Sequence, residues 1–182
     1  MALTHDPIIL DACCVLTLYG SGYMDEVLGT FPGPVQVSKY VVEEEALTVY
    51  DGPPGNVRAE ETEVELAPLV ESGIIEITSL RPGEQSTFLQ FARSLDDGEA
   101  RTLAIAANRD WAIGTDDKRA LKVCRQKTDC QPVTTPEFMH HWAESIGPPQ
   151  EEVEQALRDV YARAVYLPGS SHSKYEWWER NS

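Results

Sequence analysis

Short apolar segments that alternate with helical patterns constrain the fold of this chain most strongly. The first of them, Ile8-Ile9-Leu10, contains no polar residue and ends at Asp11. A continuous apolar strand followed by a helical pattern is typical of a parallel sheet that helices cover on both faces. Further strands are predicted at residues 35–38, 74–78, 111–114 and 131–135. We therefore expect an α/β protein, with a three-layer α/β/α fold around a central, mainly parallel sheet.

Capping and breaker residues predict where the helices lie. Ser38 is expected to be the N-cap of a helix that extends to about Tyr50, and residues 51–65, rich in Pro, Gly and acids, are predicted to form a loop. Other helices are expected at residues 66–72, 84–94, 97–109, 118–125, 135–146 and 151–166.

A break at Gly147-Pro148-Pro149 suggests how the domain is organised. Residues 1–147 are predicted to form the main domain, and residues 148–182 a C-terminal helix with a polar tail. Trp177 and Trp178 in this tail either form a hook for a partner or fold back on the core, and the second interpretation is favoured.

The chain has no feature of a membrane or secreted protein. The apolar run at residues 8–19 is too short to span a bilayer and is interrupted by Asp11. The four cysteines form no C-x-x-C pair, and the adjacent Cys13 and Cys14 are interpreted as core thiols on a strand. Free core thiols indicate a reducing compartment, so a cytoplasmic location is expected.

The net charge of -15 argues against nucleic-acid binding through bulk electrostatics, because phosphate groups would be repelled. Any nucleic-acid chemistry would need a local basic patch or metal ions. Lys118, Lys122 and Arg125 are spaced on one face of the helix after Asp117, which is consistent with an RNA path and equally with a solvated helix face.

Acidic residues fall where a parallel sheet places its functional crevice, beyond the carboxyl ends of the strands. Asp11 follows the first strand, and Asp116-Asp117 follows Thr115 after the strand at 111–114. Glu99 begins the helix after Asp96, with a spacing that also fits a capping box, and both roles can hold together.

The helix after Ser38 contributes a further acid. Periodicity places Glu45 on the apolar stripe that includes Val41 and Val42, where an unpaired carboxylate costs several kcal/mol. This favours Glu45 as the inward acid, while Glu44 remains an alternative.

Four short motifs carry a resemblance to a known family. They are Ile9-Leu10-Asp11, Val41-Val42-Glu43-Glu44-Glu45, Asp97-Gly98-Glu99-Ala100 and Gly114-Thr115-Asp116-Asp117. In this order the chain resembles the PIN-domain nucleases, which include the toxins of VapBC-type toxin–antitoxin pairs, over roughly residues 8–135.

The resemblance implies a PIN-like fold and a metal-dependent ribonuclease. It makes Asp11, the helix glutamate, Glu99 and Asp117 the metal ligands, with Asp116 as an accessory acid and Thr115 in the same cleft. Carboxylate ligands without His or Cys select Mg²⁺ or Mn²⁺. The implied partners are an RNA substrate, an antitoxin protein and a second copy of the chain in a homodimer.

Two other functions remain as alternatives. The first is a PIN-like module that has lost catalysis and acts as a binding or scaffolding domain. The second is phosphotransfer through an aspartyl nucleophile, which is disfavoured because Cys13 occupies the place where haloacid-dehalogenase chemistry needs a second Asp.

Overall fold

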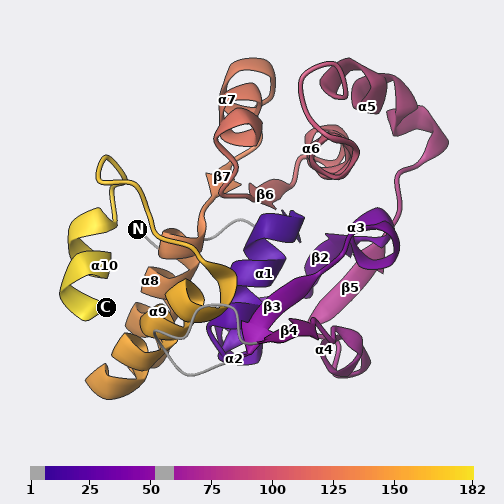
Figure 1. Cartoon of the computed structure of the whole chain (residues 1–182). Helices are drawn as coiled ribbons and strands as arrows, with labels where there is room; N and C mark the ends of the chain where they lie inside the picture. Colours follow the sequence, from indigo (N-terminus) through magenta and orange to yellow (C-terminus); the bar gives the residue numbers. More distant parts are fainter. Residues whose placement is uncertain (1–6, 52–59) are drawn as a thin grey trace.

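A computed structural model describes residues 7–51 and 60–182 of the chain (Figure 1). Its main sheet has five strands in the order β5-β2-β1-β6-β7, and all the neighbouring strands are parallel. The strands are β1 (Ile8–Leu10), β2 (Val35–Ser38), β5 (Ile75–Thr78), β6 (Ala112–Gly114) and β7 (Pro132–Val133). The predicted α/β class and parallel sheet are confirmed.

Helices cover both faces of this sheet, as in a three-layer α/β/α arrangement (Figure 1). Ile8 and Leu10 of β1 belong to a hydrophobic cluster with one set of helices, whereas Ile9 belongs to a second cluster on the other face. The first set is α1 (Ala12–Gly20), α2 (Met24–Leu28), α8 (Thr135–Ile146), α9 (Gln150–Ala164) and α10 (Tyr175–Asn181). The second is α5 (Gln85–Phe91), α6 (Asp97–Arg109) and α7 (Lys118–Lys127).

The segment after β2 differs from the prediction. Ser38 caps a helix as expected, with its Oγ accepting from the Val41 backbone nitrogen at 3.2 Å, but α3 (Lys39–Glu44) ends well before Tyr50. Residues 48–51 form strand β3 (Thr48–Asp51), because β-branched and aromatic side chains favour the extended backbone.

The predicted loop at residues 51–65 is also partly wrong. Strand β3 pairs antiparallel with β4 (Glu60–Glu63), and residues 52–59 lie outside the described part of the chain. The short helix α4 (Ala67–Glu71) and the 3-10 turn η1 (Pro82–Glu84) complete the elements. The helix predicted at residues 84–94 is shorter than expected, because Glu84 belongs to η1 and α5 ends at Phe91.

Cys13 and Cys14 lie on α1, so their predicted place on a strand is wrong. Asp11 has an extended backbone and is also the N-cap of α1. Its side chain accepts a hydrogen bond from the Ala12 backbone nitrogen. Both cysteines are free thiols, as are Cys124 and Cys130.

The C-terminal tail packs against the rest of the protein. Helix α10 contacts α8 and α9, and Trp178 is only 2% exposed within the same hydrophobic cluster as β1. The favoured interpretation of the two tryptophans is thus confirmed for Trp178. The division into residues 1–147 and 148–182 stays a prediction.

In the described residues, none of the helices combines the length and apolar character needed to cross a membrane.

Replacing Trp178 with Ala should lower the free energy of unfolding by about 3 kcal/mol or more, because the substitution leaves a cavity in the core. Trp177→Ala serves as the matched control and should cost clearly less, since Trp177 is only partly buried. Urea unfolding followed by circular dichroism measures both. Equal losses for the two variants would contradict the docking of the tail through Trp178.

Candidate metal centre

Asp11 is at the centre of the candidate site because it links the carboxyl end of β1 to the start of α1. Its Oδ1 accepts a hydrogen bond from the Ala12 backbone nitrogen, and its Oδ2 accepts one from Thr115 Oγ1, each at 3.0 Å. The residue is 3% exposed, and this burial is the main reason that the pKa of Asp11 rises to about 6. The charge of this carboxylate is therefore costly in the folded protein.

Glu99 reaches the site from the first turn of α6. It forms a capping box with Asp96: the Glu99 backbone nitrogen donates to Asp96 Oδ1 at 2.9 Å, and the Asp96 backbone nitrogen donates to Glu99 Oε2 at 3.3 Å. Burial, followed by the negative charges of Asp117 and Asp96, raises the pKa of Glu99 to about 7. The two roles that the sequence left open, helix cap and site acid, are thus compatible in one residue.

Glu45 follows the last residue of α3 and points toward the same place. Its Oε1 lies so close to α6 that a Cβ added to Gly98 would come within 1.7 Å of it. Burial, followed by the charges of Asp11 and Asp96, raises the pKa of Glu45 to about 7. Glu44 is exposed and lines a different hollow with Lys39 and Arg101, so Glu45 is the member of the pair that lies with the other acids.

Asp117 and Asp116 point to different surroundings although they are adjacent. Asp117 caps α7, with its Oδ1 accepting from the backbone nitrogens of Arg119 (2.7 Å) and Ala120 (2.9 Å), and its charge acts on Glu99. Asp116 instead accepts hydrogen bonds from Tyr166 Oη at 2.9 Å and from the backbone and side chain of Thr135.

The predicted ligands are near enough for their charges to influence one another, and the sequence analysis missed a further acid that does so. Asp96, treated there only as a helix cap, raises the pKa values of Asp11, Glu45 and Glu99 through its charge. Asp11, Asp96 and Asp117 cap α1, α6 and α7, so three helix N-termini meet at this edge of the sheet. The acidic spacing Asp96-x-x-Glu99 was the signal that could have identified Asp96. We call Asp11, Glu45, Asp96, Glu99 and Asp117 the acidic cluster.

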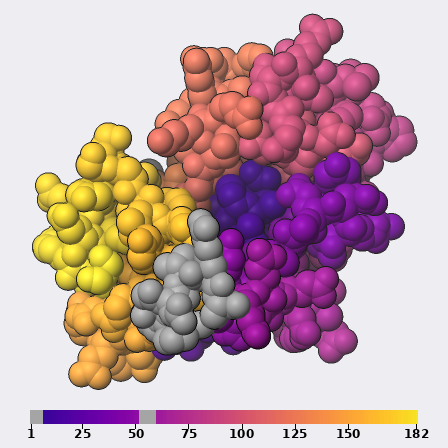
Figure 2. All heavy atoms as spheres, in the orientation of Figure 1, coloured from indigo at the N-terminus to yellow at the C-terminus, as the bar shows by residue number. Residues whose placement is uncertain are grey.

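Two acids of this cluster are buried, with Asp11 3% and Glu99 8% exposed. In Figure 2 the dark N-terminal part of the chain is visible between the surfaces of α3, α6 and α7 and the C-terminal segment. Thr115 is fully buried below it and holds Asp11 through its hydroxyl group.

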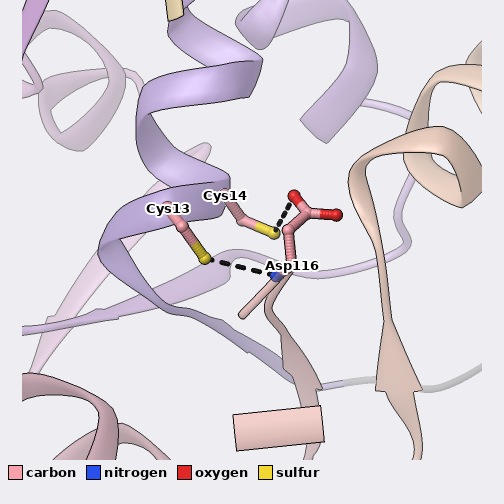
Figure 3. Close-up of side chains that lie close together, drawn as sticks. All are labelled: Cys13, Cys14 and Asp116. Carbon is pink, nitrogen blue, oxygen red and sulfur yellow. Dashed lines mark hydrogen bonds between the residues drawn. The ribbon is translucent and has the colours of Figure 1, made fainter. Parts of the chain in front are cut away.

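A tighter group of side chains that could bind a metal is formed by Cys13, Cys14 and Asp116 (Figure 3). It adjoins the acidic cluster, because Cys13 Sγ lies 3.6 Å from Asp11 Oδ2. The ligand atoms of Cys13, Cys14 and Asp116 are all within 4.8 Å of one another, which is close enough to hold a metal ion. Cys14 Sγ donates to Asp116 Oδ2 at 3.4 Å, and the Asp116 backbone nitrogen donates to Cys13 Sγ at 3.2 Å. Among the described residues, no three carboxylates approach one another as closely.

The predicted RNA-binding cations are all exposed on α7. Lys118 and Arg125 line a groove that faces the C-terminal segment, whereas Lys122 is not part of its lining. Two of the three cations predicted to share one face of the helix therefore line this groove, and the third lies outside it.

Comparisons with known proteins find no matching family model, no matching curated protein and no matching solved structure. The resemblance to PIN-domain nucleases therefore depends on the four motifs and on the positions of their acids.

The substitution Gly98→Ala should displace the Glu45 carboxylate, because the new Cβ occupies the position of its Oε1. The fold should be retained, since the obstructing atom belongs to a flexible side chain and Ala suits a helix better than Gly by about 1 kcal/mol. Carboxyl NMR titration in EDTA should then show the pKa of Glu45 falling toward its ordinary value. Gly83→Ala, where a Cβ meets no atom within 4 Å, is the control. An unchanged Glu45 titration would show that the carboxylate does not lie against α6.

The acidic cluster also predicts how stability depends on pH without metal. The folded-state pKa values of Asp11, Glu45 and Glu99 are raised to about 6, 7 and 7, so between about pH 4.5 and 7 the folded protein binds more protons than the unfolded chain. Their contribution to the free energy of unfolding must therefore decrease as the pH rises through this window. Urea midpoints in EDTA should show that Glu45→Gln reduces this decrease. A variant curve parallel to that of the wild type would contradict the expectation.

Proposed function

We propose that the protein is a Mg²⁺- or Mn²⁺-dependent ribonuclease of the PIN-like kind, which hydrolyses RNA phosphodiester bonds at the acidic cluster. One observation carries the proposal. Asp11, Glu45 and Glu99 come from separate segments; burial raises the pKa of each carboxyl group, and the charges of acids in the same cluster raise it further. Buried like charges of this kind are typical of sites that hold a cation or transfer protons.

The acidic cluster needs positive charge that its own neighbours do not provide. Two carboxylates about 4 Å apart repel by roughly 4 kcal/mol at an effective dielectric constant of about 20. In the part of the chain that the structure describes, the ion pairs of Lys39, Arg109 and Arg158 involve other acids. A bound divalent cation would relieve this repulsion.

The donor set fits a hard cation. All five members of the acidic cluster offer oxygen, the ligand that Mg²⁺ and Mn²⁺ prefer. Mg²⁺ commonly binds through one or two carboxylates and keeps several water molecules, so carboxylates spaced more widely than 4.8 Å are compatible with it.

Each residue has a separate task in this proposal. One or two of Asp11, Glu45, Glu99 and Asp117 would bind the ion directly, and the others would act on it through its bound water molecules. Asp117 retains Oδ2 for either task because its Oδ1 caps α7. Thr115 orients Asp11 by donating from Oγ1, as an outer hydrogen-bond partner does in metal sites. The bound ion supplies a more acidic water and polarises the phosphoryl oxygens.

Asp116 has a supporting task that differs from the accessory role implied by the resemblance. Its carboxylate joins β6 to α8 through Thr135 and to the C-terminal segment through Tyr166. In this proposal it positions the Thr115–Asp117 turn and does not contact the metal.

The proposed biological setting is that of a toxin controlled by an antitoxin protein, acting as a homodimer in the cytoplasm. It rests on the resemblance to VapBC-type toxins.

A catalytically inactive binding module is the second candidate. The spacing of the carboxylates supports it, because no three of them in the described residues have oxygens mutually within 4.8 Å. Metal binding without cleavage of any RNA would favour this module over the ribonuclease.

A matched pair of glutamates tests the ribonuclease. Glu45→Gln should reduce Mn²⁺-dependent cleavage of a single-stranded RNA by about 10- to 100-fold, whereas Glu44→Gln should stay within about twofold of wild type. Asp11→Asn should reduce cleavage to the metal-free background. Rates come from gel electrophoresis of a labelled RNA, and Mn²⁺-induced shifts in melting temperature report metal binding separately.

Two results would refute the proposal. One is wild-type protein that neither cleaves RNA nor gains thermal stability with Mg²⁺ or Mn²⁺. The other is an Asp11→Asn variant whose cleavage rate and Mn²⁺-induced stabilisation equal those of the wild type.

A further inference from the structure

A groove of about 620 Å³ lies next to the acidic cluster, between α7, the end of β7 and residues 166–173 of the C-terminal segment. Lys118, the first residue of α7, lines it and directly follows Asp117 of the acidic cluster. The groove and the candidate metal centre therefore share the N-terminal end of α7.

The cations of the groove are available to a ligand. Lys118 and Arg125 are both exposed, and among the described residues neither forms an ion pair. A guanidinium group can donate two parallel hydrogen bonds to a phosphate, and an ammonium group binds it as a point charge.

The acids of the groove are engaged by the protein itself. Asp116 accepts from Tyr166 Oη and from Thr135, as described above. Glu137 Oε2 accepts from the backbone nitrogen of Thr134 at 2.9 Å and from its Oγ1 at 2.7 Å. The lining thus carries two positive and two negative charges. The two carboxylates are half-buried and receive internal donors, whereas the two cations are exposed, so a ligand that enters the groove meets the cations first.

The C-terminal segment forms a fixed second wall. His172 Nδ1 accepts from the Lys174 backbone nitrogen at 3.0 Å, so its Nε2 carries the proton and donates to Thr134 Oγ1 at 2.9 Å. Trp178 anchors the following helix in the core. The rings of Tyr166 and His172 thus lie in the groove lining at defined positions.

We propose that this groove binds the single-stranded RNA substrate next to the scissile bond. Lys118 and Arg125 contact its phosphates, and the rings of Tyr166 and His172 offer stacking surfaces for bases, the combination found in single-strand binding grooves. This inference rests on the proposed ribonuclease function, and it makes the C-terminal segment part of the substrate site.

Paired substitutions on the two walls test the groove. On the C-terminal segment, Ser171→Glu adds a negative charge inside the groove, and Ser170→Glu adds the same charge to the preceding exposed residue, which is not part of the lining. On α7, Arg125→Gln removes a groove cation, and Lys122→Gln removes an exposed cation outside the lining.

Binding is measured by fluorescence anisotropy of a labelled single-stranded RNA in EDTA, where metal-dependent cleavage cannot occur. Ser171→Glu and Arg125→Gln should each raise Kd by about fivefold or more, and Arg125→Gln should also reduce the slope of log K against log salt by about 0.7. Ser170→Glu and Lys122→Gln should change Kd by less than about twofold. Melting temperatures equal to that of the wild type verify that all four variants fold.

The outcomes separate this inference from the proposed function. Equal changes in Kd within each pair, or no RNA binding by the wild type, would overturn the proposal that this groove binds RNA. If Kd differs within each pair as expected but the wild type never cleaves RNA, RNA binding in the groove is supported and the proposed ribonuclease function is wrong. If the wild type cleaves RNA and the paired variants do not differ, the groove is wrong and the ribonuclease is supported.

Discussion

Burial of carboxylates at the carboxyl edge of the parallel sheet, to which repulsion between them adds, is the constraint on which the candidate site depends. Asp11 is almost fully buried there, and Glu45, Asp96, Glu99 and Asp117 add charge around it. The N-termini of α1, α6 and α7 offset part of this charge through their backbone N–H groups, yet the pKa values of Asp11, Glu45 and Glu99 remain raised. A divalent cation or protonation would neutralise the negative charge that the helix N-termini do not offset.

Topology explains why these acids meet. In the order β5-β2-β1-β6-β7 the chain proceeds outward from β1 in both directions, so β1 lies where the strand order reverses, the usual place for a crevice in an open parallel sheet. Asp11 leaves β1 at this point, and Thr115 leaves the neighbouring β6 close enough to donate to it. The C-terminal segment extends the same edge, because Tyr166 reaches Asp116 and Trp178 fixes the following helix in the core.

The sequence was most informative where local chemistry decides the structure. The apolar run before Asp11, the cap at Ser38 and the capping box at Asp96 each act within a few residues, and the structure confirms all three. It was least informative after Glu44, where the apolar pattern suited a longer helix and pairing between β3 and β4 selected a strand. Glu45 was favoured on helical periodicity, and it joins the acidic cluster from an extended backbone instead.

By itself the sequence determined the α/β class, the parallel sheet and the segments that carry the acids, because strand and helix patterns and caps are local properties. Only the tertiary structure decided which member of each adjacent acidic pair lies in the cluster. Adjacent side chains point in different directions, so one of the pair faces the cluster and the other contacts different partners. Asp116, for example, accepts hydrogen bonds from Thr135 and Tyr166. The groove was likewise a tertiary result, since its walls at Arg125 and Ser171 are distant in the chain and meet only when the C-terminal segment packs on the fold.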